Sequence, residues 1–259
     1  MTIGFIGCGN MGSALARAVS KRGAYSISLY DLAEEKARIL SAEIGAEVTD
    51  MAGISSADAI FLGVKPYGIR EVVGKLEELG CRAMLISMAA GVKLSSIEEV
   101  LSRSLPLIRI MPNTPVQYGE GVILYSLGGA ACKKHEALLL DLLKEGGMLC
   151  QLPEELIDAG SAVSGSGPAF FYMFIDALAR GGEAAGLDYS EALTLAAKTA
   201  VGAGITLLES GRSPEELRVA VCSPGGSTIE GVGALNDGGL DATVAEAVKR
   251  TFEKAKKLG

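Results

Sequence analysis

Residues 2–12 read TIGFIGCGNMG, and this stretch decides the fold. The run Thr2–Ile6 is apolar enough for a buried strand, and glycines follow at positions 7, 9 and 12 before a helical pattern that carries Leu15 and Val19. Glycines in such a turn let the backbone approach a pyrophosphate, which then lies at the positively polarised start of the helix. The stretch therefore predicts a dinucleotide site, although a glycine-rich tight turn without a ligand gives the same pattern.

Short apolar runs alternate with helical patterns up to about residue 152. Ile69, Val73 and Leu76, for example, recur at the spacing of a helix that is packed on one side. Such alternation predicts βαβ units and a mostly parallel sheet that is covered by helices. The expected strands are Thr2–Ile6, Ile27–Tyr30, Ala59–Val64, Ala83–Ser87, Leu107–Ile110, Val122–Tyr125 and Met148–Leu152.

The pattern changes after Pro153, where the strand-like runs stop and long helical segments follow. We therefore expect an α/β protein of two domains: a Rossmann-like dinucleotide-binding domain over residues 1–152, and an all-α domain over residues 153–259. The expected helices of the second domain are Pro168–Ala185, Ser190–Glu209, Pro214–Val221, Ser227–Asn236 and Asp241–Leu258.

The composition excludes several classes of protein. Glycine supplies 34 of the 259 residues, about 13% against an average of roughly 7%, without the period of a collagen. The hydrophobic fraction of 49% is that of a globular chain, and the net charge of −7 offers no basic surface for nucleic acid or an anionic membrane. A single histidine, His135, excludes histidine-based triads and multi-histidine metal sites, so no metal is expected.

The location of the protein is expected to be cytoplasmic. We recognise no signal peptide and no run of about 18 apolar residues that would span a membrane. The five cysteines show no CxxC pairing and are expected to be free thiols in a reducing compartment. His135 follows two lysines in a charged stretch, and we expect it at the solvated surface.

Asp31 closes the second expected strand, 19 residues after Gly12. An acidic side chain at this place bonds the ribose hydroxyls of NAD and repels the 2′-phosphate of NADP. The segment Asp31-Leu32-Ala33-Glu34 also has the pattern of a capping box for the next helix. The sequence leaves both interpretations open.

Two further strands end in segments that could face a ligand. Val64-Lys65-Pro66 follows one strand, and Ser87 to Gly91 follows another, at the edge where open α/β sheets bind ligands. The small residues within Ser87–Gly91 would let a nicotinamide ring lie against backbone. A solvated lysine before a turn and a tightly packed turn are the respective alternatives.

Two glycine-rich loops precede helices in the second domain: Ser164-Gly165-Ser166-Gly167-Pro168 and Ser223-Pro224-Gly225-Gly226-Ser227-Thr228. Free amides at such a helix start can bind a carboxylate, but the serines and threonine could instead be N-caps. The aromatic cluster Phe170, Phe171, Tyr172 and Phe174 is expected to lie in a core or a subunit contact.

These motifs together resemble the pyrroline-5-carboxylate reductase family over essentially the whole chain. The similarity depends on their order along both expected domains, since each motif alone is weak. The matching segments are 5–12 (FIGCGNMG), 64–66 (VKP), 87–91 (SMAAG), 109–115 (RIMPNTP), 162–169 (AVSGSGPA) and 223–228 (SPGGST).

The resemblance implies an NAD(P)H-dependent enzyme of proline synthesis that reduces the cyclic imine 1-pyrroline-5-carboxylate to L-proline. It implies a homodimer built on the helical domain, often assembled further into a decamer. The substrate carboxylate would bind at Ser223, Gly226, Ser227 and Thr228, and the Thr228 hydroxyl would reach the ring nitrogen as the catalytic group. The expected cofactor contacts are Ile6, Gly7, Cys8, Gly9, Asn10, Met11, Gly12, Asp31, Gly63, Val64, Lys65, Pro66, Ala89, Ala90 and Gly91.

Two departures from the family pattern stand out. Members that prefer NADPH usually have a small polar residue where this chain has Asp31, which favours NADH here. Some members carry Asn or Gln where this chain has Ala220, before Val221, so a side-chain contact from that position is lost.

Two other functions compete with the reductase. A β-hydroxyacid dehydrogenase shares the two-domain layout but needs a base, usually a lysine on the first long helix of the second domain, and no lysine or histidine lies between Lys144 and Lys198. A regulator that binds a dinucleotide without catalysis is the second alternative, against which the complete Ser223–Thr228 loop argues.

Overall fold

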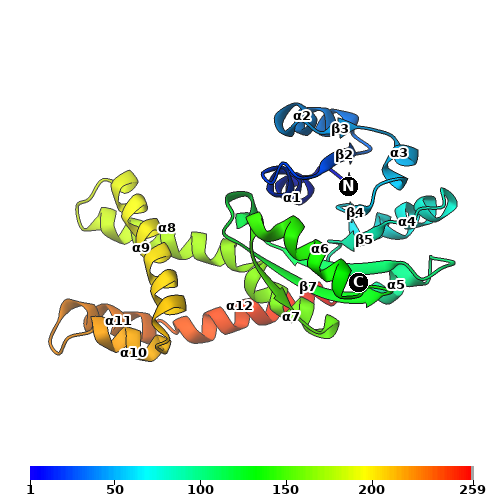
Figure 1. Cartoon of the computed structure of the whole chain (residues 1–259). Helices are drawn as coiled ribbons and strands as arrows, with labels where there is room; N and C mark the ends of the chain where they lie inside the picture. Colours follow the sequence, from blue (N-terminus) through cyan, green and yellow to red (C-terminus); the bar gives the residue numbers. More distant parts are fainter. Residues whose placement is uncertain (258–259) are drawn as a thin grey trace. The chain divides into compact units, whose positions relative to one another are not determined.

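The computed structural model describes residues 1–257 and divides them into two compact units (Figure 1). The first unit contains Met1–Ser166 together with the residues from Arg250 onward, and the second contains Gly167–Lys249. The helix α7 (Glu154–Ser164) counts with the first unit because its buried Ile157 packs against Met111 and Leu124 of the sheet. The boundary expected between residues 152 and 153 stays a prediction.

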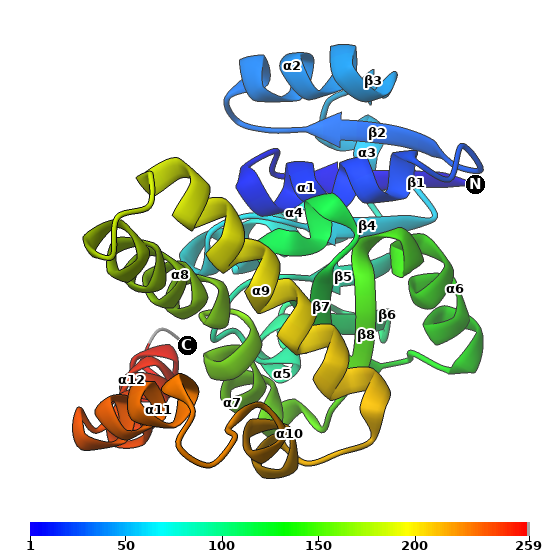
Figure 2. The same ribbon diagram turned by 90° about the vertical axis from the view of Figure 1, so that its left-hand side faces the viewer.

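The first unit is built on a single sheet, in the order β3-β2-β1-β4-β5-β6-β7-β8 among the described residues. Figure 2 shows β2, β1, β4 and β5 following one another down the view. All neighbouring strands are parallel except the pair β6 and β7, so the expected mostly parallel sheet is confirmed. The strands are β1 (Thr2–Ile6), β2 (Ser26–Tyr30), β3 (Glu47–Val48), β4 (Ala59–Leu62), β5 (Met84–Ser87), β6 (Pro106–Pro112), β7 (Gly121–Gly129) and β8 (Gly147–Gln151).

Successive strand residues face two separate cores, as the period of a strand requires. In β4, Phe61 faces a core that includes Leu15 of α1 (Asn10–Ser20), whereas Ile60 and Leu62 face a core that includes Val73 of α4 (Ile69–Glu78). Helices therefore cover both faces of the sheet. The helices α2 (Glu34–Ile44) and α6 (Lys133–Leu143) contribute to the first core, and α3 (Met51–Ser55) and α5 (Leu94–Glu98) to the second.

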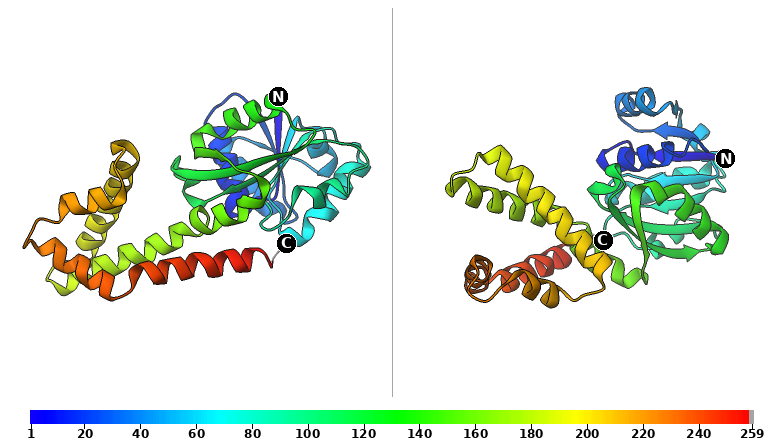
Figure 3. Two further views of the ribbon diagram at one scale, coloured as in Figure 1. Left: turned by 90° about the horizontal axis from the view of Figure 1, so that it is seen from below. Right: turned by 60° about the vertical axis from the view of Figure 1, so that its left-hand side comes forward.

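The second unit is helical, and residues 154–257 contain no strand, as the sequence predicts. Its first two long helices pack around the small residues Ala179, Ala192 and Ala196 (Figure 3). The expected helix 241–258 ends earlier, at Ala255, and Leu258 lies outside the described residues. The helices are α8 (Gly167–Ala184), α9 (Tyr189–Ser210), α10 (Pro214–Val221), α11 (Ser227–Asp237) and α12 (Leu240–Ala255), the last of which continues into the first unit.

The long helices of the second unit expose a large apolar surface. Phe171 and Tyr172 of α8 are each 63% exposed, and Leu208 of α9 is 80% exposed. The aromatic cluster is thus not a core of this chain by itself. By length and composition α9 could cross a membrane, and only 11% of its apolar window is buried within the chain. An apolar surface of this kind needs a covering partner.

Candidate functional site

The three segments expected to contact a dinucleotide lie at one edge of the sheet. Ile6 at the end of β1 pairs with Leu62 at the end of β4, and Leu62 pairs with Ser87 at the end of β5. The three strands are adjacent and parallel, so their carboxyl ends are level. The segments 7–12, 63–66 and 88–91 therefore leave the sheet side by side, at the edge where open α/β sheets bind ligands.

Two of the three fingerprint glycines are required by packing within the chain. Gly7 has φ of +98°, and a Cβ there would lie 2.5 Å from the carbonyl oxygen of Gly63. A Cβ on Gly12 would lie 2.0 Å from the carbonyl oxygen of Gly7. The turn after β1, the start of α1 and the end of β4 thus approach one another more closely than any side chain allows.

Gly9 differs from these two glycines, because a Cβ placed on it would meet nothing within 4 Å. It is the N-cap of α1, and no side chain caps that helix. The first amides of a helix have no partner within the helix and carry its positive partial charge. Open space beside uncapped amides fits the pyrophosphate of a dinucleotide.

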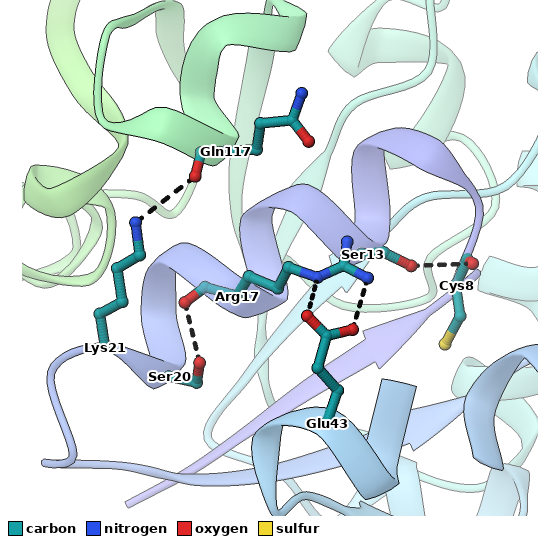
Figure 4. Close-up of polar contacts among 7 residues, drawn as sticks. All are labelled: Cys8, Ser13, Arg17, Ser20, Lys21, Glu43 and Gln117. Carbon is teal, nitrogen blue, oxygen red and sulfur yellow. Dashed lines mark hydrogen bonds and ion pairs between the residues drawn. The ribbon is translucent and has the colours of Figure 1, made fainter. Parts of the chain in front are cut away.

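Polar side chains hold α1 in place (Figure 4). The Ser13 hydroxyl donates to the Cys8 carbonyl at 2.9 Å, which fixes the turn to the helix that follows it. The Arg17 guanidinium donates twice to the Glu43 carboxylate of α2, at 2.6 and 2.7 Å. The Ser13 contact fixes the start of α1, and the Arg17 contact fixes its last turn against α2.

Asp31 supports the glycine turn and does not cap α2. Its carboxylate accepts hydrogen bonds from the amide of Cys8 at 2.7 Å and from that of Ala33 at 2.8 Å. Helix α2 begins at Glu34 with Ala33 as its N-cap and without a side-chain cap, so the capping-box interpretation is wrong. Burial, followed by the Asp31 charge, raises the pKa of the Cys8 thiol to about 11, which keeps it protonated at neutral pH.

The segment after β4 presents a lysine to solvent. Lys65 is exposed and precedes the short 3-10 helix η1 (Pro66–Gly68). After β5, Ala89 is buried in the core, and its amide donates to the Ser87 hydroxyl at 3.4 Å. Ala90 and Gly91 are half-buried, and Gly91 has φ of +76°. The turn at 88–91 is therefore tightly packed and still leaves two small residues at the edge.

A cavity of about 1230 Å³ borders this edge within the first unit. Pro66 and Gly91 line it on the side of the expected cofactor segments. Arg109, Glu154 and Asp158 also line it, and none of these three was among the expected site residues. Arg109 could have been found from the sequence, because it is a charged residue within an otherwise apolar strand.

The expected substrate loop lies at the start of α11 in the second unit. Gly225 has φ of +72°, the Gly226 amide donates to the Ser223 carbonyl at 3.0 Å, and Gly226 is the N-cap of α11 without a side-chain cap. The serines and threonine are therefore not N-caps of this helix. Ser223, Ser227 and Thr228 are exposed, so the loop presents its amides and hydroxyls at the surface of the unit.

The chain is similar to known enzymes over nearly its whole length. It is 38% identical to the pyrroline-5-carboxylate reductase of Aquifex aeolicus, with 100% of this chain and 97% of that protein matched. It is 39% identical to the enzyme of the same name from Methanosarcina acetivorans, over 99% of this chain and 97% of that protein. The chain belongs to the pyrroline-5-carboxylate reductase family.

Other comparisons agree with this family. Residues 154–258 match the model of the pyrroline-5-carboxylate reductase dimerisation domain, and residues 2–91 match the model described as NADP oxidoreductase, coenzyme F420-dependent. The crystal structure of Plasmodium falciparum pyrroline carboxylate reductase with NADP bound superposes with a TM-score of 0.91 at 26% identity, over 100% of this chain and 98% of that one. The two-part fold expected from the sequence is thus that of pyrroline-5-carboxylate reductases.

The one histidine has a structural role in this member of the reductase family. His135 is half-buried, contrary to the expectation of a solvated side chain, and its Nδ1 accepts the Cys132 amide at 3.1 Å at the start of α6. Burial, followed by the Lys134 charge, lowers the pKa of His135. Among the described residues no cluster of three metal-ligating side chains occurs.

Proposed function

We propose that this protein is a pyrroline-5-carboxylate reductase, which uses NAD(P)H to reduce 1-pyrroline-5-carboxylate to L-proline in the last step of proline synthesis. The end-to-end similarity to reductases of that name carries the proposal. In it, residues 1–152 bind the cofactor, and residues 153–259 bind the substrate and form the dimer. The level ends of β1, β4 and β5 and the uncapped start of α1 support the first assignment.

The cofactor side of the site consists of backbone more than of side chains. The amides at the start of α1 would bind the pyrophosphate, and Gly9 leaves room for it. The Asp31 carboxylate accepts the Cys8 amide and so fixes the turn, and it would lie toward the ribose of the bound cofactor. The segments Gly63–Pro66 and Ala89–Gly91 would form the wall against the nicotinamide. When bound, NAD(P)H supplies a hydride equivalent for C5 of the imine.

The substrate side relies on the loop before α11. Amides around Ser223, Gly226 and Ser227 would hold the carboxylate, because the N-terminus of α11 favours an anion. The Thr228 hydroxyl would hold the ring nitrogen or pass a proton to it. A protonated imine already carries its positive charge, so positioning is the main task of these residues and no imidazole is needed.

A hydroxyacid dehydrogenase fits this chain less well. Oxidation of an alcohol needs a general base, and α8, the first long helix of the helical unit, carries no lysine or histidine. A regulator without catalysis would bind the dinucleotide but would not need an exposed, uncapped loop such as Ser223–Thr228.

Oxidation of NADH and of NADPH should be followed separately at 340 nm, with and without 1-pyrroline-5-carboxylate. The proposal predicts oxidation that depends on the imine with at least one cofactor. A hydroxyacid dehydrogenase would instead reduce NAD(P)⁺ with a β-hydroxyacid, and a regulator would bind NADH without turnover. Absence of imine-dependent oxidation with both cofactors would reject the reductase.

We expect NADH to give the higher kcat/KM, because the Asp31 carboxylate repels a 2′-phosphate. Replacing Asp31 with serine should shift the NADPH-to-NADH ratio of kcat/KM toward NADPH by about tenfold or more. The ratio is the informative quantity, since loss of the bond to the Cys8 amide weakens the turn for both cofactors alike. A wild-type preference for NADPH would contradict the role of Asp31 and leave the reductase assignment intact.

The proposed assembly is a cytoplasmic homodimer, with a decamer as its further form. The match of residues 154–258 to a dimerisation domain and the exposed apolar side chains of α8 and α9 support a second copy, and not a membrane, as the covering surface. Light scattering without detergent should give the mass of a dimer or a multiple of it. Ile205→Glu, which puts a charge on an exposed apolar position of α9, should lower that mass, whereas Ala137→Glu on α6 should not. A monomeric wild type would contradict this assembly.

A further inference from the structure

Arg109 is the one charged side chain that is almost completely buried among the described residues, with 1% exposure, in the middle of β6. Its guanidinium donates to the Asp158 carboxylate and lies 3.6 Å from the Glu154 carboxylate, both on α7. A buried charge is costly unless it is paired, so these two carboxylates fix the guanidinium, and the guanidinium fixes them.

Glu154 makes a second contact, on a different element. Its Oε1 accepts the amide of Leu94 at 2.7 Å. Leu94 is the first residue of α5, whose N-cap, Lys93, provides no side-chain cap. The Glu154 carboxylate, on α7, therefore caps the N-terminus of α5 in place of a side chain of Lys93.

Leu94 lies three residues after Gly91, so this contact ends the segment that follows β5. At the other end, Ser87 is held in the sheet by its register with Leu62 and Arg109, and its hydroxyl accepts the Ala89 amide. The segment 88–93 is thus anchored on one side by β5 and on the other by Glu154. Arg109 is the register partner of Ser87 in the neighbouring strand, and its guanidinium is ion-paired with the Glu154 carboxylate.

We propose that Glu154, held by Arg109, is a positioning residue for the wall of the site formed by Ala89–Gly91. In this role Glu154 acts through the Leu94 amide, which fixes the backbone that would face the nicotinamide. This inference rests on the proposed function for the role of that wall. The proposal predicts that Arg109 and Glu154 affect binding of the nicotinamide half of the cofactor. Binding of the adenosine half, at α1 and Asp31, should not depend on them.

The test compares two probes of the same site on purified full-length protein. ADP-ribose contains the pyrophosphate and adenosine but lacks nicotinamide, whereas NADH contains both halves. For Glu154→Ala we expect the Kd of NADH to rise and kcat to fall, each by about tenfold, because a charge-assisted hydrogen bond is lost. The Kd of ADP-ribose should stay at the wild-type value.

Two variants serve as controls. Glu155→Ala removes the same charge from the same helical turn at an exposed position and should match the wild type with both probes. Glu154→Gln keeps an oxygen that can accept the Leu94 amide and should recover part of the NADH affinity. Calorimetric Tm values for all variants report whether the fold itself has changed.

The outcomes separate the inference from the proposed function. If Glu154→Ala binds NADH like the wild type, or loses ADP-ribose and NADH affinity equally, Glu154 does not position this wall and only stabilises α7. A wild type that shows no imine-dependent oxidation rejects the reductase, whatever the variants do. The Kd values of NADH and ADP-ribose can still be compared in that case, since their measurement needs no turnover.

Discussion

Replacing Gly12 with alanine is expected to destroy cofactor binding together with much of the stability of the sheet unit. The new Cβ would lie 2.0 Å from the Gly7 carbonyl oxygen, which belongs to backbone and cannot turn away. Relief requires that α1 move away from β1, where Leu15 and Val19 fill the core. Loss of that packing costs about 3 kcal/mol or more, a large part of the usual 5–15 kcal/mol of domain stability. Urea unfolding and NADH titration would measure both effects.

The matched control is Gly9→Ala, three residues earlier in the same turn. Gly9 has φ of −73°, which any residue adopts, and its Cβ would meet nothing within 4 Å. We expect an unfolding midpoint like that of the wild type and weaker NADH binding, because the methyl group fills the space left for the pyrophosphate. Equal NADH affinity in Gly9→Ala and wild type would show that the open space beside Gly9 is not the phosphate site.

Local patterns were enough to predict most of the fold. The strand Thr2–Ile6 and the helix Pro214–Val221 have the predicted bounds, because each combines a clear period with a turn or capping residue at its end. The two-residue strand β3 (Glu47–Val48) was missed, since two residues are too few for an alternation. Helix α7 was not predicted either; it packs on the sheet of the first unit through Ile157.

The candidate site could be predicted only where it depends on backbone. The turn at Gly7 and Gly12 could be predicted from the sequence, because the close backbone approach there permits no residue other than glycine. The contact between Glu154 and the Leu94 amide joins residues 60 positions apart, so no local pattern contains it. For Asp31, the sequence alone left two roles open, that of a ribose ligand and that of a helix cap. The structure shows a third role, in which the carboxylate accepts the Cys8 amide.

The second large effect is expected at Thr228. Its hydroxyl is the one side-chain group proposed to act on the ring nitrogen, and the backbone amides of the same loop are left in place by a substitution. Thr228→Val keeps the shape of the side chain and removes the hydroxyl at an exposed position near the start of α11. The free energy of unfolding should therefore change by no more than about 0.5 kcal/mol.

Turnover by Thr228→Val should fall by roughly 10²-fold or more if the hydroxyl relays a proton, and by about tenfold if it only orients the imine. Thr228→Ser, which restores the hydroxyl, should recover most of the rate, and Thr243→Val on α12 should behave as the wild type. Because the carboxylate would be held by amides and not by this hydroxyl, KM for the imine should rise less than kcat falls. Unchanged kcat in Thr228→Val would remove Thr228 from the mechanism and leave positioning by the amides as the whole contribution of the loop.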